Sequence, residues 1–193
     1  MIASIYLKTN NVKYAIDELE ELFELDSKNT HLYSLLAKAY KKKREKPRIR
    51  LILETAIHHK IFQPIIIETL YKIYNDELAI DKNIALFELL IEHFPSKIQY
   101  YKSLSELYIR NRNYEKAGII FRQLLTHFPE TSPELYPNLS QLIKKSPRQS
   151  QLRQMLIETC FMLRKPEEAV QHIQELTKYQ PQLSGYAVKV LKD

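Results

Sequence analysis

A tyrosine that recurs every 34 residues constrains the fold of this chain more than any other feature of its sequence. The positions are Tyr6, Tyr40, Tyr74 and Tyr108. Two prolines, Pro95 and Pro129, stand at the same interval within the similar segments IEHFP and LTHFP. A fixed period of roughly 20 to 50 residues is typical of a chain built from stacked copies of one small structural unit.

Each unit is predicted to hold two helices. Residues 114–128 place their apolar side chains on one helical stripe, at spacings of three and four, and residues 97–110 do the same. The polar residues Arg112 and Asn113 form a short turn between them. Two antiparallel helices cannot hide both apolar faces by themselves, so each pair has to stack on the next pair.

The glycine content supports an all-α protein. Only two glycines, Gly118 and Gly185, occur in 193 residues. Proteins made of many short strands need tight turns, and these turns depend on glycine. A chain of this length buries roughly 70% of the surface that it exposes when unfolded, which is enough for a stable core.

The repeat resembles the tetratricopeptide repeat, whose pattern is an aromatic residue, a leucine with a small residue, a tyrosine, an alanine, a second aromatic residue and a closing proline. The unit that matches best carries Tyr101, Leu104, Ser105, Tyr108, Ala117, Phe121, Leu124 and Pro129. The resemblance implies a right-handed superhelical solenoid of antiparallel helix pairs, with about five repeats and one extra short helix. Ile49 and Asn83 depart from the pattern, because alanine is preferred at those positions.

The 34-residue frame predicts a single solenoid over residues 1–193. Its parts are a partial unit 1–29, units 30–63, 64–97 and 98–131, an insertion 132–149, a unit 150–183 and a closing helix 184–193. The insertion is inferred because Pro129 and Pro181 stand 52 residues apart, which is 34 plus 18. Pro137 should interrupt a helix begun at Ser132, so a short helix from about residue 137 to residue 145 is expected. The alternative division treats residues 132–165 as one degenerate unit.

The positive charge is concentrated in one stretch. The basic residues there are Lys41, Lys42, Lys43, Arg44, Lys46, Arg48 and Arg50. Against Glu45 they supply 7 − 1 = +6, which equals the net charge of the whole chain. In the repeat frame, residues 44–47 form the turn of the second unit, so the stretch is interpreted as a solvated rim. Aromatic residues for stacking on single-stranded nucleic acid are missing after Tyr40.

The family resemblance also implies a binding site. The first helix of each unit should line a concave groove that holds a peptide or a helix of a partner protein. The groove residues in this sequence are Ser34, Lys38, Lys41, Lys42, Glu68, Lys72, Asn75, Gln99, Lys102, Glu106, Ile109 and Arg110. Lysine dominates the early part, so an acidic or C-terminal segment is the expected ligand. The lysine and asparagine pattern that holds chaperone tails in some family members is not reproduced here.

No group of residues predicts catalysis, a cofactor or a metal site, so the chain is expected not to be an enzyme. Adjacent His58 and His59 point about 100° apart on a helix, which suits metal binding poorly. His93 and His127 stand before equivalent prolines and are interpreted as structural. Cys160 takes the repeat position of the tyrosine, where a small packed thiol is expected.

The leading hypothesis is therefore a non-enzymatic scaffold that binds another protein. Two alternatives remain open: a helical repeat that associates with nucleic acid through residues 41–50, and the targeting arm of a larger enzyme. The lone cysteine and the lack of a basic region before the first apolar residues favour a cytoplasmic location, unless a targeting segment precedes this sequence. No apolar run reaches the roughly 18 residues of a membrane span.

Overall fold

The computed structural model describes residues 2–185, and every regular element in this range is a helix. The predicted all-α class with paired, stacked helices is confirmed. The chain divides into two compact units, Met1–Ala79 and Ile80–Asp193. The predicted repeat 64–97 has one helix in each unit, and the single array over residues 1–193 stays a prediction.

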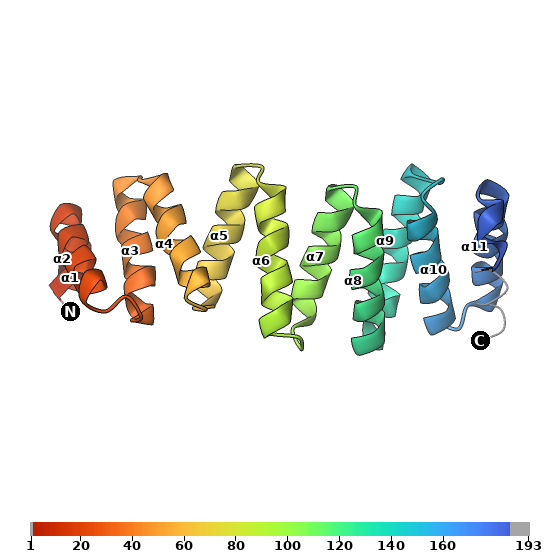
Figure 1. Ribbon diagram of the computed structural model, residues 1–193, viewed down its shortest axis with the longest axis horizontal. Helices are drawn as coiled ribbons and strands as arrows, with labels where there is room; N and C mark the ends of the chain where they lie inside the picture. The colour runs from red at the N-terminus through yellow and green to blue at the C-terminus, as the bar shows by residue number, and fades with distance from the viewer. Residues whose placement is uncertain (1, 186–193) are drawn as a thin grey trace. The chain divides into compact units, whose positions relative to one another are not determined.

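Five helices form the first unit, and each packs against the next along the chain (Figure 1). They are α1 (Ile2–Lys8), α2 (Val12–Leu25), α3 (Thr30–Lys43), α4 (Lys46–His58) and α5 (Pro64–Asp76). Asn29 caps the start of α3, where its side chain accepts a hydrogen bond from the His31 N–H at 3.2 Å. Pro64 opens α5, where its missing N–H costs nothing.

The second unit contains the other helices and two short 3₁₀ turns. They are α6 (Ile80–His93), α7 (Ile98–Arg110), α8 (Tyr114–His127), η1 (Pro129–Thr131), α9 (Ser132–Lys145), α10 (Ser150–Met162), α11 (Pro166–Tyr179) and η2 (Pro181–Leu183). Helix α10 packs against α8, α9 and α11. The second helix of one pair, α8, therefore contacts the first helix of the next pair, α10, directly, although α9 stands between them in the sequence.

The turn inside each helix pair repeats with the same backbone geometry. One residue in every such turn has a left-handed φ of 55° to 63°: Asn10, Arg44, Leu78, Arg112 and Arg164. The following N–H bonds back to the carbonyl of the repeated tyrosine, for example Glu45 N–H to Tyr40 O at 3.0 Å. This arrangement closes the end of a helix. Lys165 N–H bonds in the same way to Cys160 O at 2.9 Å.

The spacing of these turns favours the division with an insertion. The left-handed residues follow each other at steps of 34, and the last step, from Arg112 to Arg164, is 52. Helices α10 and α11 begin 16 residues apart, as α7 and α8 do. Helix α9 thus stands outside the pairs. The individual unit boundaries remain a prediction.

The prediction of a short helix from residue 137 was wrong. Helix α9 begins at Ser132 and contains Pro137 in its interior. A proline inside a helix costs about 3 kcal/mol or more, because it removes a hydrogen bond and crowds the preceding turn. The apolar face of α9, formed by Leu135, Leu139 and Ile143, is buried, and this burial offsets that cost.

The turn predicted at residues 44–47 is shorter, because α4 begins at Lys46 and accommodates Pro47 in its first turn. The closing helix predicted for residues 184–193 lies outside the described residues, except for residues 184 and 185.

Small residues are buried at one repeat position of the second helices. Ala15, Ala117 and Ala169 are almost completely buried at equivalent positions of α2, α8 and α11. A larger side chain would push the two helices of a pair apart. Ile49 stands at the same position in α4 and is also buried, so this pair tolerates a larger residue.

Candidate functional site

The predicted groove residues of the first unit lie on α3 and α5. Lys38, Lys41, Glu68 and Lys72 are exposed. Among the described residues, none of these four side chains has a hydrogen bond or an ion pair. Ser34 is half-buried, and its hydroxyl donates to the His31 carbonyl at 3.0 Å. Asn75 is half-buried near the end of α5. We call Ser34, Lys38, Lys41, Glu68, Lys72 and Asn75 the first-helix face.

Lys42 differs from its neighbour Lys41. Its ammonium group donates to the Leu7 carbonyl at 2.8 Å and lies 3.5 Å from the Asn10 side chain. A cation at this place satisfies a carbonyl at the end of α1 and interacts favourably with the helix dipole. Lys42 therefore links α3 to α1. Its ammonium group makes an internal hydrogen bond and, unlike that of Lys41, is not left to interact with a ligand alone.

In the second unit the predicted groove residues lie on α7. Gln99, Glu106 and Arg110 are exposed, whereas Lys102 and Ile109 are half-buried. Lys102 forms an ion pair with Glu134 of the inserted helix α9. The basic charge expected at this position is therefore neutralised within the unit.

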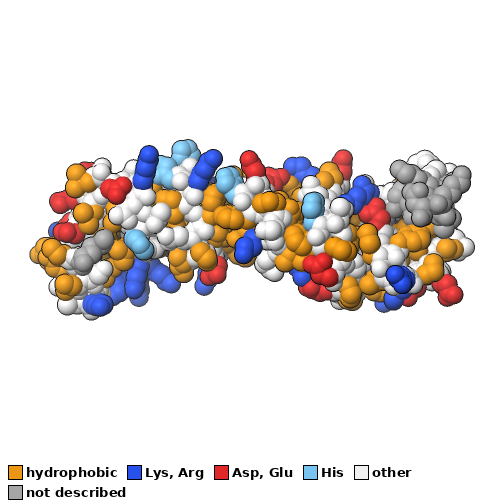
Figure 2. Space-filling model, turned by 90° about the horizontal axis from the view of Figure 1, so that it is seen from below, with side chains coloured by type: hydrophobic (Ala, Val, Ile, Leu, Met, Phe, Trp, Pro, Cys, Tyr) orange, Lys and Arg blue, Asp and Glu red, His pale blue; other side chains and the backbone are white. Residues whose placement is uncertain are grey.

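The basic stretch 41–50 is also partly neutralised by internal contacts. Lys43 pairs with Glu45 at 2.9 Å, Arg48 pairs with Glu20 at 3.0 Å, and Arg50 pairs with Glu77 at 2.8 Å. The Arg48 guanidinium also lies over the Tyr40 ring, 5.6 Å from its centroid. In Figure 2, Lys and Arg side chains gather near the end of the molecule that the N-terminal helices form.

The repeated tyrosine joins consecutive helix pairs through a glutamate that stands 20 residues earlier. Tyr40 donates to Glu20 at 2.6 Å and Tyr74 donates to Glu54 at 2.9 Å. In the second unit Tyr108 donates to Glu88. We call these contacts the Tyr–Glu junctions. The sequence already held the signal for them, because Glu20, Glu54 and Glu88 recur at the same interval as the tyrosines.

Burial and the neighbouring carboxylate change the acidity of these phenols. Desolvation, followed by the Glu20 hydrogen bond and charge, raises the pKa of Tyr40 to about 12. Desolvation and Glu54 raise the pKa of Tyr74, and desolvation and Glu88 raise the pKa of Tyr108. The tyrosines are therefore stable hydrogen-bond donors, which is a structural role.

Helix α10 buries an arginine that no sequence pattern indicated. Arg153 of α10 is 2% exposed and forms an ion pair with Glu175 of α11. Its guanidinium also donates to the Pro147 carbonyl at 3.0 Å. Together with Tyr136 and His172, Arg153 lines a hollow of about 740 Å³ formed by residues of α9, α10 and α11. Burial, followed by the charge of Arg153, lowers the pKa of His172.

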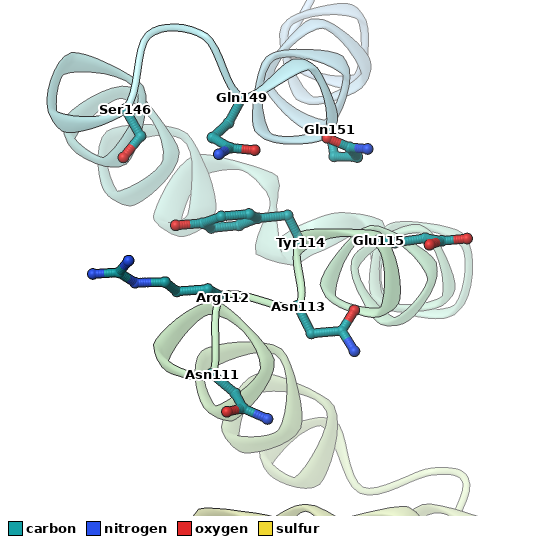
Figure 3. A pocket seen from close by; sticks show the side chains of 8 residues that line it. All are labelled: Asn111, Arg112, Asn113, Tyr114, Glu115, Ser146, Gln149 and Gln151. Atoms are coloured by element: carbon teal, nitrogen blue, oxygen red, sulfur yellow. The ribbon is translucent and has the colours of Figure 1, made fainter.

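A second, polar hollow of about 780 Å³ lies between two turns of the second unit (Figure 3). Asn111, Arg112, Asn113, Tyr114 and Glu115 come from the turn between α7 and α8 and the start of α8, and Ser146, Gln149 and Gln151 come from the turn between α9 and α10 and the start of α10. The Tyr114 ring and the Arg112 side chain extend in the same direction below the segment that carries Ser146 and Gln149. The lining has one cation and one carboxylate, so it favours no particular ligand charge.

The histidines have structural contacts. His59 contacts the Tyr33 hydroxyl at 2.6 Å through Nδ1, and that hydroxyl donates to the Ser27 carbonyl at 2.6 Å. His59 Nδ1 therefore donates to the phenol oxygen. His93 and His127 each contact the carbonyl four residues earlier through Nδ1, at 3.0 and 2.8 Å. Within the described part of the chain no group of His, Cys, Asp and Glu could hold a metal ion.

Cys160 is completely buried, as its packed role required. Burial, followed by the charge of Glu168, raises the pKa of its thiol to about 11. A nucleophilic cysteine needs the opposite shift, because the thiolate is the reactive form. None of the helices among residues 2–185 combines the length and the apolar character needed to cross a membrane.

The repeat and its helix pairs define a tetratricopeptide-like architecture. No family model matches the sequence, and no curated protein is similar to it. Several solved structures align with this chain. One is YrrB, described as a TPR protein with an unusual peptide-binding site, at 12% identity over 99% of this chain and 89% of that chain, with a TM-score of 0.44.

Two further similar structures are of MamA. One shares 12% identity over 96% of this chain and 98% of that chain, with a TM-score of 0.45. The other, MamA from residue 41 to its end from Desulfovibrio magneticus RS-1, shares 10% identity over 94% of this chain and 92% of that chain, with a TM-score of 0.44.

Proposed function

We propose that this chain is a non-enzymatic scaffold that binds an acidic segment of a partner protein on the first-helix face. The observation that carries the proposal is that the lysines of this face are exposed and have no ionic partner among the described residues. Lys38, Lys41 and Lys72 are exposed and have no carboxylate partner among residues 2–185. In the same unit Lys43, Arg48 and Arg50 all have one. The first-helix face thus keeps cations available.

The charge on this face suits an acidic partner for two reasons. Its three exposed lysines outnumber the single carboxylate of Glu68, and a net positive surface attracts an acidic ligand and raises the rate of encounter. It also discriminates against basic competitors. The structure offers less support for nucleic acid, because much of the charge in residues 41–50 is paired internally. A scaffold of this kind needs no catalytic group, which agrees with the structural contacts of its histidines and with the raised pKa of the Cys160 thiol.

Peptide binding tests the proposal. The ligands are two fluorescein-labelled peptides of about 15 residues that differ only in having Glu and Asp or Lys and Arg at the charged positions. Fluorescence anisotropy should show binding of the acidic peptide only, with an affinity that falls as salt rises. The double variant Lys38→Glu, Lys72→Glu should weaken binding by about tenfold or more.

The control is Lys46→Glu, which changes the charge of an exposed lysine at the start of α4. It should alter affinity less than the double variant does. Equal affinity of wild type and double variant for the acidic peptide would contradict the proposal. Tight binding of short RNA by the wild type, lost when residues 41–44 become alanine, would favour the nucleic-acid alternative.

A further inference from the structure

The Tyr–Glu junctions show what normally covers the first helix of a pair. Helix α2 covers α3, α4 covers α5, and α6 covers α7. Each junction buries a leucine four residues before the tyrosine: Leu36, Leu70 and Leu104 are each 1% exposed. In each, the covering helix supplies a glutamate that accepts the tyrosine hydroxyl. The same contact therefore occurs three times in the described chain.

Helix α1 carries the equivalent positions, and no helix among residues 2–185 covers them in this way. Ile2, the equivalent of Leu36, is 55% exposed, and Ile5, the equivalent of the buried Ala39, is 60% exposed. Tyr6, the equivalent of Tyr40, is half-buried, and the structure records no hydrogen bond from its hydroxyl within the described range.

A second aromatic residue enlarges this surface. Tyr14 is 62% exposed, and its ring centroid lies 5.8 Å from that of Tyr6. It stands where Arg48 and Lys116 stand at two of the junctions, and those two cations lie over the junction tyrosines. The surface formed by Ile2, Ile5, Tyr6 and Tyr14, which we call the α1 end face, is therefore more apolar than the junctions.

We propose that the α1 end face is a docking site for an amphipathic helix of a partner protein, and that a glutamate of this helix accepts the Tyr6 hydroxyl. The surface continues the interface that the chain uses three times internally. At each internal copy the occupant is a helix with an apolar stripe and a glutamate that accepts the tyrosine hydroxyl, so the same chemistry fits α1. This site shares no residue with the first-helix face, and the two proposals can fail separately.

The occupant also has a defined pattern. In α2 the accepting Glu20 is followed three residues later by Phe23, whose ring packs edge-on against Tyr33 at 5.1 Å. In α6 the accepting Glu88 is next to Phe87, whose ring lies 6.1 Å from that of Tyr100. A partner helix should therefore combine one glutamate with a neighbouring aromatic or large aliphatic residue.

The chain supplies its own probe for the test. A labelled peptide of residues 80–93, which form α6, is placed between helix-forming Glu-Ala-Ala-Ala-Lys segments so that it is helical before binding. Anisotropy titrations with the full 193-residue chain should show saturable binding. The variant Ile5→Lys should abolish it, and Tyr6→Phe should weaken it severalfold, as the loss of one hydrogen bond does.

The matched controls separate docking from other causes. A probe with Glu88→Gln should bind wild type more weakly but should lose less affinity when Tyr6→Phe is introduced. The variant Leu51→Lys changes an exposed apolar residue on α4 and should bind the probe like wild type. Circular dichroism should show that Ile5→Lys folds, because Ile5 is exposed.

Three results would overturn the proposal. Absence of binding up to about 1 mM probe, or binding that Ile5→Lys leaves unchanged, shows that the α1 end face does not accept such a helix. Self-association of the wild-type chain in sedimentation experiments, abolished by Ile5→Lys, would mean that a second copy of this chain is the occupant instead of a partner protein.

Discussion

Tyr33 in the first unit and Arg153 in the second stand at the same place in the repeat. Each is the fourth residue of its helix, α3 or α10, and each is almost completely buried. Tyr33 contacts His59, whereas Arg153 lies over the ring of Tyr179, the residue equivalent to His59. The repeat therefore fixes that a large side chain fills this place, while its polarity depends on the neighbours.

The exposed charges of the two units differ in a similar way. Among residues 2–185, the ammonium groups of Lys38 on α3 and Lys72 on α5 have no ionic partner, but Lys102 on α7 is paired with Glu134 of α9. The inserted helix thus supplies a carboxylate that the regular repeat lacks. An insertion can change the binding properties of a repeat without changing its helix pairs.

The largest expected effect is at Tyr33. Replacement by alanine should lower the free energy of unfolding by about 3 to 5 kcal/mol, because it empties a fully buried aromatic site. Tyr33→Phe should lose only the two hydrogen bonds. Thermal melts followed by circular dichroism measure both; a loss for Tyr33→Ala no larger than for Tyr33→Phe would speak against a packed ring.

Arg153→Ala should cost about 2 to 4 kcal/mol, because it leaves the Pro147 carbonyl without its donor and opens a cavity. Arg153→Met should cost less, since an apolar side chain of similar length needs no ionic partner. Urea unfolding of the two variants compares them directly. If the methionine variant is the less stable one, the charge itself stabilises the last helix pair.

Ala117→Ile should destabilise the chain by about 1 to 3 kcal/mol, because Ala117 is buried and a larger side chain would force α8 away from its neighbour α7. The control is natural: Ile49 occupies this repeat position in the first unit. Melting temperatures of Ala117→Ile and Ala117→Ser distinguish size from polarity. An unchanged melting temperature for the isoleucine variant would show that the second unit tolerates the larger residue as well.

Tyr40→Phe should cost about 0.5 to 1.5 kcal/mol by removing a Tyr–Glu junction, whereas Tyr6→Phe should have almost no effect on stability. The pKa of Tyr40 is raised from 10 to about 12, so the folded state holds the phenol proton more tightly. The stabilisation should be complete below about pH 10 and should disappear as the pH rises toward 12. Melting curves across this range should fall less steeply for Tyr40→Phe than for wild type.

Lys102→Ala should have the smallest effect, at most about 1 kcal/mol, because Glu134 is largely exposed. Lys38→Ala should have none, since Lys38 has no ionic partner among the described residues. The difference should shrink in 1 M salt, where the Debye length is about 3 Å. Equal melting temperatures for the two variants at low salt would mean that the Lys102–Glu134 pair does not stabilise the second unit.

Much of the fold could be predicted from the sequence because helix-pair repeats depend on contacts that are local and periodic. The 34-residue tyrosine spacing gave the paired helices, and the step from Pro129 to Pro181 indicated the insertion. The start of α9 was predicted wrongly because of Pro137. The energetic cost of a proline inside a helix is offset by the burial of Leu139 and Ile143. The placement of the predicted groove residues on α3, α5 and α7 could also be predicted from the repeat.

The hydrogen bonds and ion pairs of the groove lysines could not be predicted from the sequence in the same way. Lys38 and Lys42 look alike in the sequence, yet only Lys42 reaches a carbonyl of α1. The residues around Lys102 do not predict its ion pair with Glu134, which stands 32 residues later in the chain. Contacts of this kind depend on how one helix pair lies against its neighbour.

The sequence by itself determined that the chain forms antiparallel helix pairs, because apolar periodicity and regular turns act within a few residues. Only the tertiary structure decided, among residues 2–185, which lysines lack an ionic partner, which tyrosines donate to a glutamate, and that α1 exposes an apolar face. Each of these depends on whether another helix brings a partner within hydrogen-bond or van der Waals distance, and helix periodicity alone does not specify that distance.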